Sequence, residues 1–425
     1  MATEVRPKLV VVYHYFSIPP FEVAEAARNL CDLIWVFDFT DPLLSPMLPL
    51  IRRFGTTLDT AGLGDAEVAA QVARHHPDGV ITFASEQVLL AAAIAEASSL
   101  RFYSCRTADL LTNKYRQRAA LAQARVPGPA FWPVAADTEP TARARLVADL
   151  SYPVVLKPQA GSGSRSTYRV AKAEALLRLL DEAQRRGEDM LIEEELLEAH
   201  PRSAQRFGDV LMVDSLVSEG RMTHFVVGGH FIPAPHFRGT GSFVPSHLDE
   251  TETKAVFEAT EAALKAVGAA DGFTNTDLIL TSDGPRVLEV NGRIGGQIRK
   301  LLQLAGAPPL LPEAMRFAVR ESDGDVAPLQ SEQVAFCMMY QPPIGAQRLV
   351  ELSGLDVVDH LDGVTEVIPD RRAGDAIDWR QGTASRLFIV YGLANDHDHL
   401  LELYQQIQAS IVARYEMDEM AEPSS

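Results

Sequence analysis

The chain has 425 residues, of which 47% are hydrophobic and 23% are charged. This composition is that of a folded globular protein and excludes a disordered or fibrous chain, while the length favours two or three lobes. The formal net charge of −18 argues against nucleic acid as a partner, because a surface that binds phosphate backbones needs clustered Lys and Arg.

The cysteines and the absence of long apolar runs further limit the class of protein to which the chain can belong. Cys31, Cys105 and Cys337 lie far apart and match neither zinc-ligand nor disulfide spacings. The first eight residues lack the apolar stretch of a secretory signal, and no apolar run is long enough to span a bilayer. We therefore expect a cytoplasmic protein that does not contact membranes.

Strands and helices alternate in the predicted N-terminal lobe. Apolar runs at 9–13, 33–37 and 80–83 are typical of strands, and helical patterns follow them at 21–30, 66–75 and 86–97. This alternation predicts a parallel sheet. The turn after the first strand has no GxGxxG motif, so NAD is not expected to bind here.

A helix and a small α+β unit follow this lobe. Thr107 is expected to cap a helix that continues through Leu121 and ends before Pro127-Gly128-Pro129, which indicates a linker. Beyond the linker we predict strands at 154–157 and 167–171, a helix from 172 to about 186, and a strand at 190–194.

The rest of the chain is predicted to be mainly β up to residue 300 and α+β beyond it. We expect a loop at 228–247, a helix at 250–267, a hairpin turn at 282–285, strands at 334–340 and 387–391, and a closing helix from 397 to about 415. The fold class is therefore α/β and α+β. Its expected parts are an N-terminal α/β domain (1–107), a core (108–315) with a lid subdomain at about 127–198, and a C-terminal α+β subdomain (316–425).

The predicted hairpin carries two carboxylates and two amides. If Leu280 lies opposite Arg286 across the turn, then Asp277 faces Glu289 and Asn275 faces Asn291. Alternation puts these four polar residues on one face of the hairpin. The opposite face would then carry Leu278, Leu280, Leu288 and Val290.

The facing carboxylates predict a magnesium site. They repel each other unless a cation lies between them, and Mg²⁺ prefers carboxylate oxygens together with substrate phosphates. A solvent-exposed polar face with a shifted register is the alternative.

A glycine-rich turn follows the hairpin. It contains Arg293, Gly295 and Gly296, and a helix-like stretch begins at Ile298. A strand that runs into such a turn exposes backbone N–H groups that can hold an anion, and the Arg293 guanidinium suits phosphate or carboxylate. The glycines alone would more often be turn or packing residues.

A second glycine-rich loop, residues 161–166, follows Lys157. In Walker loops and in protein kinases the Lys comes after the glycines, so neither motif fits. We interpret the loop as a flap that closes over phosphates, with Lys157 as a phosphate ligand; a plain surface hairpin is the alternative. The acidic end of the next strand, at 193–196, can hold adenine and ribose or is a solvated strand end.

The order of these motifs resembles the ATP-grasp superfamily. Within it, the segment GFTNTDLILTSDGPRVLEVNGRIGGQ is similar to that of the L-amino-acid ligases, which form dipeptides. The resemblance covers about residues 75–300. It implies an ATP-grasp fold with an N-terminal parallel-sheet lobe, a central lid and a C-terminal catalytic lobe.

The resemblance also implies ligands and roles. ATP and two Mg²⁺ ions would be bound, and the substrates would be a carboxylate and an amine, both amino-acid-like. The implied nucleotide ligands are Lys114, Lys157, Gly161, Ser162, Gly163, Ser164, Ser166, Glu193, Glu194, Glu195 and Leu196. The metal ligands would be Asp277 and Glu289, assisted by Asn291, and the catalytic groups Arg293, Lys157, Gly295 and Gly296. Substrate contacts would come from Glu86, His230, Asn275 and Arg293.

Several alternatives stay open. The same scaffold serves carboxylases and ribonucleotide-amine ligases, and a regulatory protein that binds ATP without turnover is a third interpretation.

The chain has Asn275-Thr276-Asp277 where amino-acid ligases often carry His-Thr-Glu, a departure that bears on the substrate more than on the metal. The histidines between 224 and 247 have irregular spacings that disfavour zinc. A homodimer is compatible with the sequence.

Overall fold

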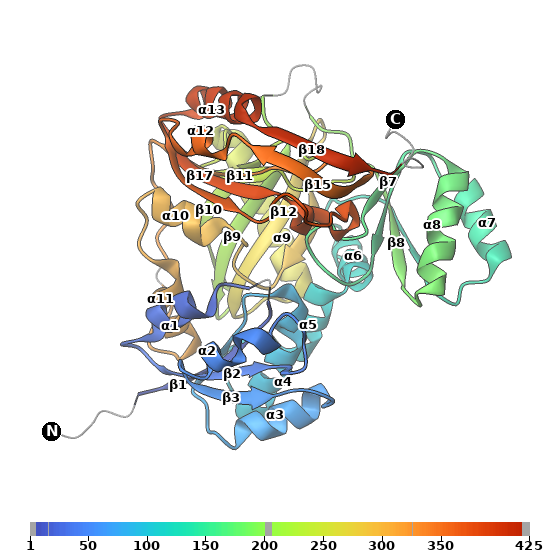
Figure 1. The fold of residues 1–425 in the computed structure, drawn as a ribbon. Coiled ribbons are helices and arrows are strands. Elements are labelled where there is room, and N and C mark those ends of the chain that lie inside the picture. Colours follow the sequence, from blue (N-terminus) through green and yellow to red (C-terminus); the bar gives the residue numbers. More distant parts are fainter. Residues whose placement is uncertain (1–5, 16, 200–205, 325, 419–425) are drawn as a thin grey trace.

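The structure is a computed structural model that describes residues 6–15, 17–199, 206–324 and 326–418. In Figure 1 the N-terminal lobe lies at the bottom, the lid projects to the right, and a large sheet occupies the centre and top. None of the helices in the described ranges is long and apolar enough to cross a bilayer.

The N-terminal lobe is built on a parallel sheet, as predicted. Its strands pair in the order β3-β2-β1-β4, and both faces of β1 are buried, which is typical of a parallel sheet covered by helices. No element was expected between residues 38 and 65, where the structure has two short helices and β3. The elements of the lobe are β1 Lys8–Val12, α1 Pro20–Ala27, β2 Asp32–Phe37, η1 Ser45–Met47, α2 Leu48–Ile51, β3 Thr56–Asp59, α3 Asp65–Ala73, β4 Gly79–Ile81, η2 Ser85–Gln87 and α4 Val88–Ser98.

Two helices connect this lobe to the lid, α5 Cys105–Thr112 and α6 Lys114–Gln123. The prediction that Thr107 caps one long helix is wrong. The Ser104 hydroxyl caps α5 by accepting the Thr107 N–H, and the Asn113 side chain caps α6 by accepting from Arg116. Because the helical conformation is interrupted at Asn113, Lys114 becomes the first residue of α6, and the N-terminal end of α6 points at the candidate site.

The lid is a small α+β unit with its own apolar core. Its sheet has the order β5-β8-β6-β7, and its two helices lie on the outer side of the sheet in Figure 1. The predicted strands and helix of the lid are confirmed. The elements are β5 Phe131–Val134, α7 Pro140–Ala148, β6 Val154–Pro158, β7 Tyr168–Val170, α8 Ala173–Arg185 and β8 Met190–Glu194.

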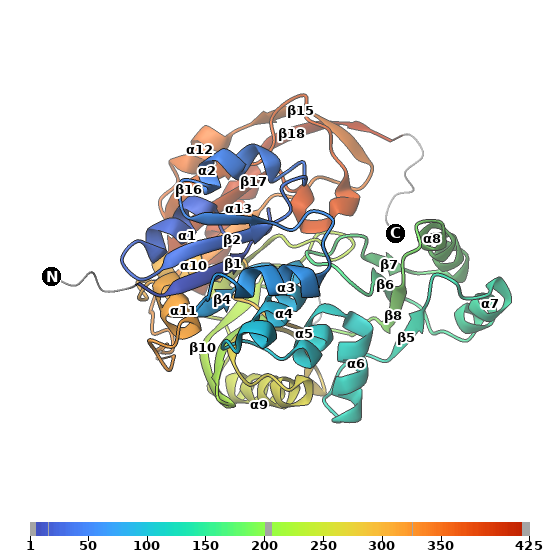
Figure 2. The same cartoon turned by 90° about the horizontal axis from the view of Figure 1, so that it is seen from below.

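An eight-stranded sheet with the order β13-β12-β9-β10-β11-β14-β17-β16 forms the centre of the molecule. The expected boundary at 315/316 crosses α11, and β14, β16 and β17 continue the sheet of the core, so the C-terminal segment is not a separate body. Figure 2 shows α11 beside the N-terminal lobe, where it contacts β4. The strands are β9 Val210–Ser218, β10 Arg221–His230, β11 Gly241–Val244, β12 Gly272–Thr281, β13 Gly284–Asn291, β14 Val334–Met339, β16 Val364–Pro369 and β17 Phe388–Ala394.

Two predictions in this half of the chain need correction. The expected loop at 228–247 includes the end of β10 and all of β11, which pair with each other. The closing helix ends at Ser410, because residues 412–417 form β18 and pair with β15 instead of continuing the helix. The remaining elements are α9 Glu250–Val267, α10 Ile298–Leu304, α11 Leu310–Ala318, β15 Ala346–Ser353, α12 Leu355–Asp359, η3 Trp379–Ser385, α13 His397–Ser410 and β18 Val412–Met417.

Candidate active site

The hairpin of β12 and β13 places the predicted polar pairs face to face. Asp277 lies opposite Glu289, and Asn275 lies opposite Asn291. The assumed starting point was wrong, because Arg286 pairs with Ile279 and not with Leu280. A β-bulge makes up the difference, since one strand contributes an extra residue between the two registers.

The bulge also changes which apolar residue is buried. The residue of β13 without a partner in the ladder is Leu288, which is only half-buried. Val287 is fully buried and joins Leu278 and Val290 in the core. Simple alternation predicts that Leu288 is the buried residue. That prediction is wrong because alternation does not allow for the residue that the bulge inserts.

The two carboxylates of the hairpin differ in pKa. Burial and, second, the charge of Glu289 raise the pKa of Asp277 to about 7. Burial alone would raise the pKa of Glu289 too, but Lys114 and Lys157 outweigh it and hold this pKa below the usual value. Lys114 Nζ lies 2.9 Å from Glu289 Oε1. A divalent cation would stabilise both carboxylates as anions.

The donor set of the hairpin fits magnesium better than a metal held by protein alone. Asp277 and Glu289 supply two carboxylates and Asn291 an amide. Among the described residues, no three His, Cys, Asp or Glu side chains come together as a cage. Magnesium characteristically takes one or two carboxylates and completes its shell with substrate phosphates and water.

Arg293 joins the hairpin to the N-terminal lobe. Its Nε donates to Ser85 Oγ at 3.2 Å, and its Nη1 donates to the Ile294 carbonyl at 3.0 Å. Its positive charge contributes to the lowered pKa of Glu86 and of Glu289 and partly opposes the rise in the pKa of Asp277. The guanidinium is therefore electrostatically coupled to Glu86 and to both carboxylates of the hairpin.

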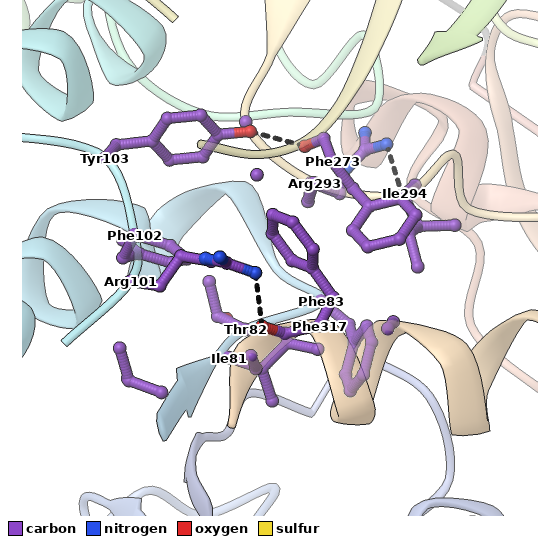
Figure 3. A pocket seen from close by; sticks show the side chains of 15 residues that line it. Ile81, Thr82, Phe83, Arg101, Phe102, Tyr103, Phe273, Arg293, Ile294 and Phe317 are labelled. Carbon is purple, nitrogen blue, oxygen red and sulfur yellow. Dashed lines mark hydrogen bonds between the residues drawn. The ribbon is translucent and has the colours of Figure 1, made fainter. Parts of the chain in front are cut away.

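Apolar side chains pack against the glycine-rich turn that carries Arg293. Figure 3 shows Arg293 and Ile294 beside a small cavity that is lined by Phe83, Phe273 and Phe317. The cavity lies between the N-terminal lobe, β12 and α11, and the Tyr103 hydroxyl donates to the Phe273 carbonyl at 2.6 Å. This packing holds the turn against the lobe that supplies Ser85 and Glu86.

The two glycines of the turn have different environments. The Gly295 N–H donates to Asp214 Oδ1 at 2.7 Å, so the expected contact of this amide with a reacting group is not available. A Cβ at Gly295 would lie 2.8 Å from Asp214 Oδ2, whereas a Cβ at Gly296 would meet nothing within 4 Å. Gly296 is therefore the glycine that faces open space.

A buried trio of charges connects the lid to the core. Glu193 accepts from Lys157 Nζ at 2.7 Å and from Arg118 Nε at 3.0 Å. Arg118 also donates to the carbonyls of Val287 and Leu288. The Glu193 carboxylate therefore has an ion-pair role, and its expected contact with adenine or ribose stays a prediction. Sequence reasoning missed Arg118, which lies in α6 without a motif.

The neighbouring acidic residues also have protein partners. Glu194 is exposed and accepts the Ala130 N–H at 3.1 Å. Glu195 accepts from Arg169 Nε at 2.8 Å. Leu196 follows the end of β8 and is half-buried. The strand end is therefore organised by ion pairs and backbone contacts, and its backbone remains the part that can meet a nucleotide base.

The flap at 161–166 contacts the N-terminal lobe and a loop of the core. Lys114 Nζ donates to the Gly161 carbonyl at 2.5 Å, and Ser162 Oγ donates to Glu86 Oε1 at 2.6 Å. Ser164 Oγ donates to the Phe237 carbonyl at 2.8 Å. Both expected nucleotide lysines, Lys114 here and Lys157 beside Glu193, therefore lie at the base of this flap.

The flap also contacts the C-terminal part of the chain. The Thr383 N–H donates to the Gly163 carbonyl at 2.9 Å, and the Ser166 N–H donates to the Arg380 carbonyl at 3.0 Å. Gly382 has a positive φ of 67°, and a Cβ there would lie 2.2 Å from the Gly163 carbonyl oxygen. The close approach of the two segments requires glycine at this position.

The histidines of 224–247 lie in different surroundings. His230 ends β10, and burial lowers its pKa to about 4, so its ring is neutral at pH 7. His224 bonds to Ser215 Oγ, His236 stacks on Trp379, and His247 lies beside Phe207. A substrate contact by His230 stays a prediction.

Comparison with known proteins identifies a domain in the chain. Residues 111–297 match the model of the ATP-grasp domain. The chain is 28% identical over 215 residues to an uncharacterised protein of Sinorhizobium fredii, a match of 49% of this chain that spans 42% of that protein, less than half its length. It is 22% identical over 316 residues to the L-arginine-specific L-amino acid ligase of Bacillus subtilis, covering 71% of this chain and 72% of that one.

Solved structures share the fold over nearly the whole chain. The L-amino acid ligase from Bacillus licheniformis has a TM-score of 0.74 at 19% identity and covers 97% of this chain and 100% of that one. The carboxyaminoimidazole ribonucleotide synthase from Aspergillus clavatus complexed with ATP has a TM-score of 0.69 at 13% identity, over 95% and 99% of the two chains. The chain therefore contains an ATP-grasp domain, and it resembles the L-amino acid ligases in sequence and fold.

Proposed function

We propose that the protein is an ATP-dependent carboxylate–amine ligase that joins amino-acid-like substrates through an acyl phosphate. The observation that carries the proposal is the convergence of Lys114, Lys157 and Arg293 on the facing carboxylates of Asp277 and Glu289. Three cations and a pair of magnesium-type ligands suit phosphoryl transfer to a carboxylate. The similarity to two L-amino acid ligases supports the substrate class.

In the first step, a carboxylate oxygen of the first substrate attacks the γ-phosphorus of ATP. A P–O bond forms, the bond to the bridging oxygen breaks, and ADP leaves. Lys114 and Lys157 hold the phosphates, while the flap at 161–166 excludes water. Asp277 and Glu289, assisted by Asn291, would hold magnesium, which would supply positive charge to neutralise the phosphates.

In the second step, a neutral amine attacks the acyl carbon. The C–N bond forms, the C–O bond to the bridging oxygen breaks, and inorganic phosphate leaves with that oxygen and takes up the proton that the amine loses. Arg293 and the Gly296 N–H are proposed to stabilise the oxyanion of the tetrahedral intermediate. Glu86, His230 and Asn275 are proposed to contact the substrates beside Arg293.

Substrate screening tests this function directly. We expect ADP release that depends on a carboxylate, and trapping with hydroxylamine should give a hydroxamate of that substrate when the amine is omitted. The correct amine should suppress the hydroxamate and give an amide. Release of AMP and pyrophosphate, or release of ADP that never depends on a carboxylate, would contradict the mechanism.

A carboxylase or ribonucleotide-amine ligase activity is the second candidate. It is favoured by the similarity to the carboxyaminoimidazole ribonucleotide synthase over nearly the whole length of both chains. ADP release stimulated by bicarbonate and an amino sugar phosphate, with no response to amino acids, would support this candidate instead. A regulatory ATP-binding protein would release no ADP with any of these substrates.

A further inference from the structure

Asp214 is a fully buried carboxylate that the mechanism above does not use. It lies in β9 directly opposite Asn275 of β12, and its exposed fraction is 0%. Its immediate neighbours in the strand, Val213 and Ser215, are equally buried. A carboxylate in such a position loses its hydration and requires compensation from the protein.

The compensation comes from two neutral donors. Asp214 Oδ1 accepts the Gly295 N–H at 2.7 Å, and Asp214 Oδ2 accepts from Asn275 Nδ2 at 3.0 Å. No ion pair with Asp214 is formed within the described ranges of the chain, although the charge of Arg293 helps to stabilise it. Burial raises the pKa of Asp214 to about 6 despite these bonds, so the carboxylate is held at a cost.

The two donors belong to the two sides of the site. Asn275 is on β12, two residues before Asp277, and Gly295 is in the turn, two residues after Arg293. Asp214 thus ties the strand that carries a magnesium ligand to the turn that carries the anion-binding arginine. Because the carboxylate lies within 3 Å of where a Cβ of residue 295 would be, the contact also requires glycine there.

We propose that Asp214 is a positioning residue that fixes the turn 292–296, so that Arg293 and the Gly296 N–H face the reacting carboxylate. The proposal rests on the ligase function proposed above. Asp214 holds the Gly295 N–H on one side of the turn, and Gly296 faces open space. Small displacements of such groups are costly, because a shift of about 1 Å in a catalytic constellation can reduce the rate by about 10²-fold.

Asp214→Ala, Asp214→Asn and Ser215→Ala separate this role from general stability. Asp214→Ala removes both acceptors. Asp214→Asn keeps one acceptor for the Gly295 N–H and can pair with Asn275 if that amide rotates. Ser215 is the matched control, because it is the next residue, is equally buried and bonds to His224 instead.

Hydrogen exchange of the peptide 292–297 and steady-state kinetics are the two measurements. We expect Asp214→Ala to speed exchange in this peptide and to lower kcat by about 10-fold to 10²-fold, with the KM for ATP changed by less than about twofold. Asp214→Asn should recover most of both effects. Ser215→Ala should change neither, even if it lowers the thermal stability.

Unchanged exchange in 292–297 after Asp214→Ala would overturn the proposal, and so would an unchanged kcat or an equal loss in Ser215→Ala. If Asp214→Ala does not fold, Gly295→Ala tests the same contact from the other side and should reproduce its effects. Exchange needs no substrate. If the parent protein forms no hydroxamate from any carboxylate, the ligase function fails, while the exchange data still decide whether Asp214 holds the turn.

Discussion

Replacing Glu193 with Gln tests whether this carboxylate holds the lid or binds the nucleotide. The Glu193 side chain is 5% exposed and lies between Lys157 and Arg118, whose side chains are 12% and 4% exposed. Gln keeps the shape but has one acceptor oxygen, and its NH₂ group must face one of the two cations. Removing one member of a buried ion pair in this way costs about 3–5 kcal/mol.

Local opening of the lid is the quantity to measure, because a chain with several lobes does not unfold in one two-state transition. Hydrogen exchange in β6 and β8 should be faster by about 10²-fold or more in Glu193→Gln, since each 1.4 kcal/mol corresponds to about tenfold. Glu188→Gln is the matched control. Its partner Arg186 and Glu188 itself are both exposed, so about 0–1 kcal/mol is expected there.

The opposite result would refute this account of Glu193. If Glu193→Gln leaves exchange in β6 and β8 within about threefold of the parent and instead raises the KM for ATP, the carboxylate serves the nucleotide and the ion pairs contribute little. If the variant loses both the protection of β6 and β8 from exchange and the affinity for ATP, then lid closure and nucleotide binding depend on the same trio of charges.

Three further predictions concern the hairpin and the flap. Glu289→Gln should lower kcat by about 10²-fold or more, because stabilisation of charge on the transferring phosphate is lost; near-normal ADP release at limiting magnesium would show that Glu289 is not a metal ligand. Gly382→Ala should weaken ATP binding in a titration, since its Cβ would push the Gly163 carbonyl away; an unchanged affinity would mean that this contact does not hold the flap closed. Val287→Ala should lower the free energy of opening of the hairpin by about 2 kcal/mol and Leu288→Ala by less than half of that, and the reverse order, measured by hydrogen exchange, would argue against the bulge.

Local patterns in the sequence were sufficient for much of the fold. The alternation of apolar runs and helices predicted the N-terminal sheet, and the two strands on either side of the glycine-rich loop were also predicted. The facing pairs of the hairpin were predicted correctly, although the register assumed at the turn was one residue out, because the bulge compensates for that error. The two-residue alternation of side chains is a local property of each strand. The predicted facing residues therefore stay correct when a bulge offsets a one-residue error in the register at the turn.

The predictions failed where distant segments decide the outcome. The ion pair of Glu193 with Arg118 was missed, because no local signal indicates that a residue of α6 reaches the carboxylate of this strand. Asp214 was overlooked, although a single Asp within the apolar run LMVDSLV is a detectable anomaly. The closing helix was predicted to continue to about residue 415, but residues 412–417 pair with β15, and this pairing overrides the weak helix propensity of a short segment. The homodimer and the cytoplasmic location stay predictions.

The continuity of the eight-stranded sheet has a consequence for how the protein is made. β11 pairs on one side with β10 and on the other with β14, which is synthesised much later. Until β14 leaves the ribosome, one side of β11 exposes unpaired N–H and C=O groups, and such edges promote aggregation. We therefore expect a chain cut at residue 297 to be recovered mainly as aggregates, even though it keeps the whole matched ATP-grasp segment.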